Sequence, residues 1–223
     1  MPEYTHGLTA PFKQMDPIGR LLPDSNVKGG VCFALSSLWI RRHKNNKGET
    51  AAKRIEFLGL DSTIFHAAIM QRLYGAEYVD DTTGGHERAQ NVAMDYRGMK
   101  YNDRSYEKFA PFSDDVSDEN VKDMLAGMNT ATSRTHEYTM VSFDFVGGGA
   151  HATCCYKSGG KILGMGSHLY AFDPNFGEFK VKGGEIKEFY RALFSRDHDY
   201  RNKKGELSRH TIRSVTLRGV TVT

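Results

Sequence analysis

The sequence predicts an α+β fold in which a helical first half packs on an antiparallel β-sheet formed by the second half. Apolar residues recur at helical spacing through residues 31–74, whereas alternating strands separated by glycine-rich turns follow from residue 137. Helices that precede a series of hairpins are typical of α+β proteins. The 223 residues suffice for one domain with a sizeable core, which we place at residues 26–223.

The first 25 residues are predicted to form an extended N-terminal arm. They contain Pro2, Pro11, Pro17 and Pro23, and prolines spaced in this way favour irregular chain. We therefore expect residues 1–25 to lie outside the regular elements of the domain and to be mobile.

The central element of the predicted fold is a buried helix that begins near Val31 and ends near His43. Residues 31–40 are apolar almost all the way round, which is typical of a helix buried on every side. Cys32 would lie in its first turn, where the exposed amides and the helix dipole favour a thiolate. Gly29 and Gly30 would let another chain approach the sulfur. A nucleophile and a structural thiol are both consistent with this stretch.

Four further helices and five strands follow from the patterning. The apolar face expected for the helix at Ser62 to Tyr74 comprises Ile64, Phe65, Ala68, Ile69 and Leu73. The other predicted helices are Glu49 to Leu60, Asp118 to Met128 and Glu185 to Ser195. The predicted strands are Glu137 to Val146, Ala150 to Tyr156, His168 to Asp173, Phe176 to Lys182 and Thr211 to Thr221. Residues 77–115 are polar and give no clear pattern.

Composition excludes several classes of protein. The net charge of +3 is too small and too dispersed for a nucleic-acid-binding protein. The longest apolar run, residues 31–40, is too short to span a membrane, and residues 1–20 lack the apolar core of a signal peptide. Three cysteines, two of them adjacent at Cys154 and Cys155, do not form a disulfide framework and indicate a reducing compartment. No further ligands occur at metal-site spacing, so we expect neither a metal nor a cofactor.

His151 is the strongest candidate among the histidines for a base that activates Cys32. It follows three glycines at the start of a predicted strand, where a substrate backbone could approach. Asp173 ends the next strand, and neighbouring strands would bring its carboxylate beside the imidazole to orient it. His168 competes for the role of the base, but it would lie on the same strand as Asp173 with its side chain on the opposite face. A strand histidine held by structural hydrogen bonds and a simple Asx turn at Asp173 are the alternatives.

A cysteine nucleophile also needs donors for the oxyanion of a tetrahedral intermediate. The side-chain amide of Asn26 and the backbone N–H of Cys32 are the candidates, with Ser25 as the alternative to Asn26. A plain surface loop explains residues 24–26 equally well.

Three motifs in this order resemble the YopT/AvrPphB family of papain-like cysteine proteases, which are bacterial effectors and toxin domains. They are GVCFAL at residues 30–35 followed by Trp39, GAHA at residues 149–152, and FDPNFGEF at residues 172–179. The resemblance covers Asn26 to Phe194. It implies a papain-like fold in which the helical half, with the cysteine on its central helix, packs on the antiparallel sheet.

The resemblance also implies roles for individual residues. Cys32 would be the nucleophile, His151 the base, Asp173 the orienting residue and Asn26 an oxyanion donor. The substrate would be a host protein, and the enzyme would be secreted by a bacterium without a cleaved signal peptide and act in the cytosol of a target cell. Residues 77–135 match no motif of the family, and this region helps to choose the substrate in such enzymes.

Two other functions stay open at the level of the sequence. An acyltransferase, transglutaminase or deamidase would use the same Cys-His-Asp triad and the same thioester, which an amine or water then attacks. A catalytically inactive effector would only bind a host protein.

Overall fold

The computed structural model describes residues 6–22, 27, 30–77, 85–109, 123, 126, 138–145, 149–159, 166–194, 200–201, 207–208 and 212–223. A seven-stranded sheet, antiparallel at every pairing, has the order β1-β6-β5-β4-β3-β9-β2. Its strands are β1 (Leu8–Pro11), β2 (Met99–Phe109), β3 (Tyr138–Phe145), β4 (Ala150–Lys157), β5 (His168–Asp173), β6 (Gly177–Lys182) and β9 (Ile212–Val222). Strands β7 (Tyr200–Arg201) and β8 (Leu207–Ser208) pair with each other. The α+β class is therefore confirmed.

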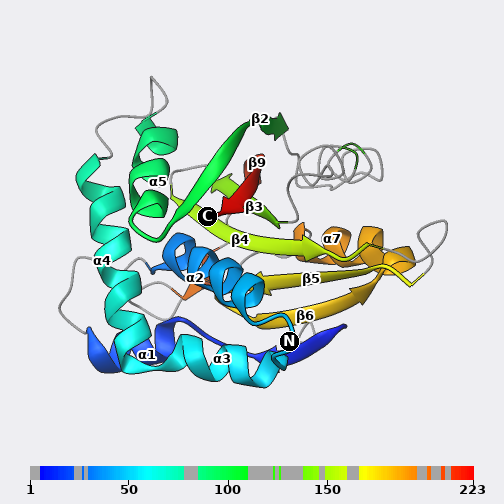
Figure 1. Ribbon diagram of the computed structural model, residues 1–223, viewed down its shortest axis with the longest axis horizontal. Coiled ribbons are helices and arrows are strands. Elements are labelled where there is room, and N and C mark those ends of the chain that lie inside the picture. Colours follow the sequence, from blue (N-terminus) through cyan, green and yellow to red (C-terminus); the bar gives the residue numbers. More distant parts are fainter. Residues whose placement is uncertain are drawn as a thin grey trace.

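The helices lie on both faces of this sheet. Helix α2 (Cys32–Asn45) crosses the face of β4, β5 and β6, while α7 (Ile186–Phe194) lies behind the sheet (Figure 1). Helices α1 (Met15–Leu21), α3 (Ala51–Gly59), α4 (Asp61–Glu77) and α5 (Gly85–Asp95) surround α2 on its outer side. Among the described residues, no helix has the length and apolar character needed to cross a bilayer.

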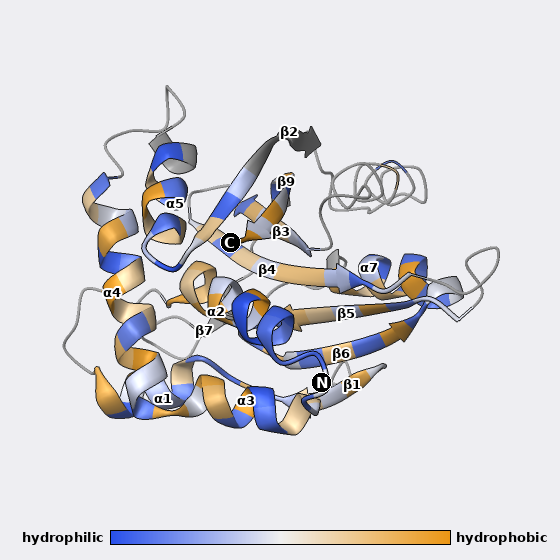
Figure 2. Ribbon diagram, in the orientation of Figure 1, coloured by the Kyte–Doolittle hydropathy of each residue, from blue (hydrophilic) through white to orange (hydrophobic). Residues whose placement is uncertain are grey.

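The sheet separates two hydrophobic clusters. The cluster on the α2 side includes Trp39, Met140, Cys154 and Phe172. The cluster on the α7 side is formed by Phe143, Cys155, Phe179 and the apolar stripe of α7, among others. In Figure 2, which is coloured by hydropathy, β4 and β5 are in hydrophobic colours through most of their length. Both faces of the central strands are therefore covered by apolar side chains.

Helix α2 is buried as its sequence predicts. Every residue from Phe33 to Ile40 is buried, and the two serines within this run have partners for their hydroxyl groups. Ser36 Oγ donates to the carbonyl of Ala152 on β4 at 3.1 Å, and Ser37 Oγ donates to the carbonyl of Phe33 at 2.9 Å. A helix can be buried on all sides only when its few polar groups are satisfied in this way.

The described part of the expected N-terminal arm has regular structure. β1 pairs with β6 at the edge of the sheet, and α1 buries Ile18 with 2% of its surface exposed. The prolines do not prevent this, because Pro11 ends an edge strand and Pro17 lies in the first turn of α1, where no intrahelical N–H is needed. Residues 8–21 thus form part of the fold and differ from the extended arm that we expected.

Two elements in the region without a clear pattern were not predicted, namely α5 and β2. β2 pairs with β9 at the other edge of the sheet. Of the helix expected at Asp118 to Met128, the structure describes Asp123 and Ala126, both helical, and the rest lies outside the described residues.

The apolar face expected for α4 was partly wrong. The helix buries Thr63, Ala67 and Met70, whereas Phe65 and Ile69 are 47% and 43% exposed. Helices α1, α2, α3 and α5 pack against α4, and they determine which side of it is buried.

Candidate active site

Cys32 begins helix α2 and is the only one of the three cysteines with partial exposure. All three are free thiols. Burial by itself would raise the pKa of the Cys32 thiol, but a hydrogen bond to His151 and the positive charge of His151 lower it. Backbone hydrogen bonds from Ala152 and Phe33 lower the pKa further. The thiolate is therefore favoured at this position, as at other helix N-termini beside an imidazolium.

His151 lies at the start of β4 with 1% of its surface exposed. Its ring stacks on Phe143, the residue opposite it on β3, with centroids 6.1 Å apart. Nε2 donates to Asp173 Oδ1 at 3.0 Å, and the ring also interacts with the Cys32 thiol. Burial would lower the pKa of His151, but the charge and hydrogen bond of Asp173, with those of Cys32, raise it to about 10.

Asp173 ends β5, the strand that pairs with β4, and is 2% exposed. A tight turn follows it, in which the backbone N–H of Asn175 donates to Asp173 Oδ1 at 2.8 Å. Gly177 closes the turn with a φ of +123°, and a Cβ there would meet the carbonyl oxygen of Ala10 at 2.1 Å. Only glycine therefore fits at this position between the turn and β1.

The structure thus brings together three of the four residues singled out from the sequence. Cys32, His151 and Asp173 come from α2, β4 and β5 and form one continuous set of contacts. Asn26, the expected oxyanion donor, and Ser25, its alternative, lie outside the described residues. His168 is not part of the set, because it pairs with Lys182 at the far end of β5 and its Nδ1 donates to the carbonyl of Gly166 at 3.0 Å.

Two buried groups beside the site were missed. Gln14 joins the start of α2 to the turn after Asp173, and its sequence context gave no signal. Glu178, 1% exposed, accepts from Trp39 Nε1 at 2.8 Å and from Arg54 Nε at 2.9 Å, so it fixes β6 against α2 and α3. Trp39 follows the first of the quoted motifs and Glu178 lies in the third. The two motifs together could have pointed to the buried hydrogen bond between these side chains.

The described residues offer no metal centre. Among them, no three metal-ligating side chains come together. Cys154 lies in the cluster on the α2 side of the sheet, whereas Cys155 lies in the cluster on the α7 side. The two adjacent thiols therefore point to opposite faces and cannot bind one ion together.

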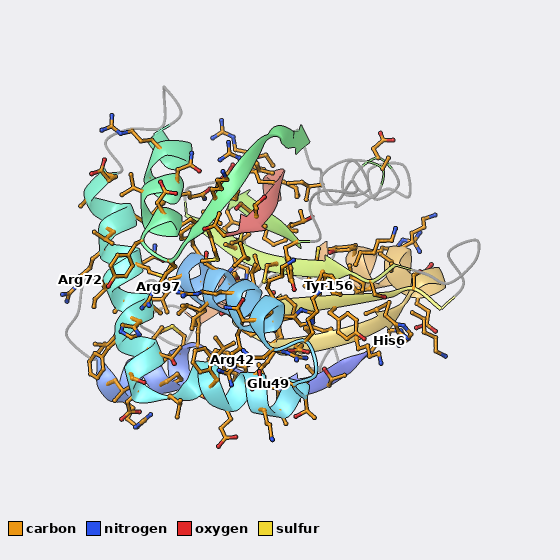
Figure 3. All side chains as sticks on the ribbon, in the orientation of Figure 1. His6, Arg42, Glu49, Arg72, Arg97 and Tyr156 are labelled. Carbon is orange, nitrogen blue, oxygen red and sulfur yellow. The ribbon has the colours of Figure 1, made fainter. Side chains whose placement is uncertain are left out.

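A cavity of about 440 Å³ lies at the other end of α2, away from Cys32. His43 reaches it from the last turn of α2, and its Nδ1 lies 2.8 Å from Tyr138 Oη. Figure 3 shows Tyr156 on this side, with Arg42 and Glu49 where α2 leads into α3; Arg42 Nε donates to Glu49 Oε2 at 2.9 Å. None of the three residues brought together at Cys32 lines this cavity.

Comparison with solved structures supports the expected fold. The Pseudomonas avirulence protein AvrPphB is 18% identical, and the alignment covers 88% of this chain and 94% of that one with a TM-score of 0.62. PatoxP, a cysteine protease-like domain of the Photorhabdus asymbiotica toxin PaTox, is 14% identical over 90% of this chain and 87% of that one. Its TM-score of 0.20 is too low to support an argument. None of the curated proteins matches the chain.

Comparison with protein families gives the more specific result. The sequence model of Peptidase_C58, described as Yersinia/Haemophilus virulence surface antigen, matches residues 3–215. This match covers nearly the whole chain, including the three motifs that resemble the YopT/AvrPphB proteases. The chain belongs to the cysteine peptidase family Peptidase_C58.

Proposed function

We propose that the chain is a cysteine protease that cleaves a peptide bond in a host protein. Cys32 is the nucleophile, His151 the base and Asp173 the residue that orients the base. The observation that carries the proposal is the continuous contact from the Cys32 thiol through the His151 ring to Asp173 Oδ1, at the N-terminus of a buried helix. A lowered thiol pKa beside a raised imidazole pKa is what a thiolate–imidazolium pair requires.

In the first half of the reaction, the Cys32 thiolate attacks the carbonyl carbon of the substrate. A carbon–sulfur bond forms, and the electron pair of the carbonyl π bond moves to oxygen. When this intermediate collapses, the carbon–nitrogen bond breaks and the His151 imidazolium gives its proton to the leaving amine. The product is a thioester on Cys32 and a neutral imidazole.

In the second half, neutral His151 takes a proton from water as the water oxygen attacks the thioester carbon. The carbon–sulfur bond then breaks, the carboxylic product leaves, and the thiolate–imidazolium pair is restored. Throughout both halves, Asp173 holds the ring by its Nε2–H and stabilises the imidazolium. The N–H of Cys32 and the amide of Asn26 would bind the oxyanion.

The proposal includes where the enzyme works. The description of the family names a virulence surface antigen, and the solved structure with the same fold, AvrPphB, is an avirulence protein. We assign this chain to the same kind of role, as a bacterial effector or toxin delivered into the cytosol of a target cell. Three free thiols and no disulfide among the described residues are consistent with a reducing compartment.

The test is to label new protein N-termini in host cells that express the wild-type chain or Cys32→Ala. The proposal predicts new N-termini only with the wild type. Cys154→Ala is the matched control, because it removes the same atom from a buried position, and it should behave as the wild type.

Other outcomes of this experiment would overturn the proposal. Deamidated glutamine or new isopeptide bonds, without new N-termini, would show that water or an amine attacks a thioester formed from a side-chain amide. No Cys32-dependent change of any kind would indicate a protein that only binds its host partner.

A further inference from the structure

Gln14 lies between β1 and α1, is 1% exposed, and connects two parts of the candidate active site. Its side-chain Oε1 accepts from the backbone N–H of Val31 at 2.9 Å. Its Nε2 donates to Asn175 Oδ1 at 2.7 Å, and its backbone N–H donates to the carbonyl of Pro174 at 2.7 Å. One buried amide thus bonds both to the peptide before Cys32 and to the turn after Asp173.

At the start of α2, the contact with Gln14 fixes the chain that leads into Cys32. Val31 is the N-cap residue, is fully buried, and uses its own N–H in this bond. Gly30 has a φ of +108°, and a Cβ there would lie 3.0 Å from Gln14 Oε1. The glycine therefore lets the chain pass close to Gln14 while it turns into the helix. The orientation of the first helical N–H groups depends on this turn.

At the other end, the contact with Gln14 fixes the turn that holds Asp173. Asn175 accepts from Gln14 with its side chain and donates its backbone N–H to Asp173 Oδ1 at 2.8 Å. The same carboxylate oxygen accepts from His151 Nε2. Hydrogen bonds therefore run from Gln14 through Asn175, Asp173 and His151 to Cys32, and Val31 leads back to Gln14.

We propose that Gln14 is a positioning residue that closes this ring and holds the helix start and the Asp173 turn in register. Its side-chain hydrogen bonds go to Val31 and Asn175, so it acts on the sulfur and the imidazole through the segments that carry them. The segment from Leu8 to Gln14 is then a required part of the active site. This inference concerns the geometry of the site, and only its effect on the reactivity of Cys32 rests on the proposed function.

Two variants test the positioning role of Gln14, one on each side of its hydrogen bond to Asn175. Gln14→Met keeps the length of the side chain but removes both hydrogen bonds and leaves the buried Val31 N–H without an acceptor. Asn175→Ala removes only the acceptor of Gln14 Nε2, at a half-buried position where folding is less at risk. The matched control is Tyr138→Phe, which removes a buried hydrogen bond to His43 at the other end of α2.

The first readout is the rate at which iodoacetamide alkylates Cys32 as a function of pH. At neutral pH we expect Gln14→Met to lower this rate about tenfold or more, within the 10²-fold range for a misplaced catalytic group. The inflection should move up toward that of an ordinary thiol. Asn175→Ala should shift it in the same direction but less, and Tyr138→Phe should leave it unchanged. A loss of stability alone would not move the inflection.

The second readout is amide hydrogen exchange at Val31 and Asn175, which does not depend on catalysis. Exchange at both amides should become faster in Gln14→Met and stay slow in Tyr138→Phe. If both amides stay protected in Gln14→Met, or if the alkylation profile keeps its wild-type inflection, the positioning role is wrong. If Cys32 is alkylated as an ordinary thiol and His151→Ala does not change its rate, the proposed function is wrong. The hydrogen-exchange data then decide by themselves whether Gln14 holds the start of α2 and the turn after Asp173.

Discussion

Cys32 and the Cys154–Cys155 pair place the same side chain in two different surroundings within one molecule. Cys32 opens a helix beside the His151 imidazole, and a hydrogen bond and charge interaction with His151 lower its pKa in spite of burial. Burial raises the pKa of Cys154 well above its ordinary value and that of Cys155 to about 11. The Cys154 thiol donates to the carbonyl of Ser36 at 3.3 Å, as a structural group does. Burial alone therefore does not decide the reactivity of a cysteine, because the partner of the thiol decides it.

The largest expected difference in activity is between the alanine variants of Cys32 and of Cys154. Cys32→Ala should reduce peptidase activity by at least about 10⁴-fold, since the proposed nucleophile is lost. Cys154→Ala should keep wild-type activity and cost about 1 kcal/mol in the free energy of unfolding, because it leaves a small void. The measurements are cleavage of an authentic substrate and urea unfolding. Full activity in Cys32→Ala would end the protease proposal.

The two strand histidines extend the comparison. His151→Ala should be nearly as damaging as Cys32→Ala, and the double variant should match either single one, because residues that act as a unit do not contribute additively. His168→Ala should remain active, since His168 bonds to Gly166 and not to the site. The measurement is the rate of substrate cleavage by Cys32→Ala, His151→Ala, His168→Ala and the Cys32→Ala/His151→Ala double variant. An active His151→Ala with an inactive His168→Ala would show that the base was assigned wrongly.

A smaller effect is expected at the proposed oxyanion donor, Asn26. Asn26→Ala should lower turnover by about 10²–10³-fold with little change in substrate affinity, which is the usual scale for one donor. Ser25→Ala is the control and should behave as the wild type. A reversed result, with Ser25→Ala impaired and Asn26→Ala normal, would transfer the role to Ser25.

The sequence predicted the parts of the fold in which one strong local signal decides the structure. The apolar pattern of residues 31–40 predicted a buried helix, and the structure contains it. The spacing of two adjacent strands was enough to place His151 beside Asp173, which are 3.0 Å apart.

What the sequence could not predict depends on contacts between distant segments. Gln14 has no local signal, because its partners Val31 and Asn175 lie 17 and 161 residues away. The strand at Leu8–Pro11 is stabilised by pairing with β6, and the proline at its end obscured it. On α4, Phe65 and Ile69 looked like core residues, but the neighbouring helices bury the other side.

The most direct test of the central claim is the rate of alkylation against pH, followed separately for the three cysteines of one sample by peptide mass. Thiolates react, so each rate rises through the pKa of its own thiol. We expect Cys32 to react well below the ordinary thiol pKa of about 8.5, and Cys154 and Cys155 only at strongly alkaline pH or on unfolding. Asp173→Ala should slow Cys32 near neutrality, because the imidazolium loses its carboxylate. A single inflection near 8.5 for Cys32, unchanged in Asp173→Ala and His151→Ala, would contradict the account.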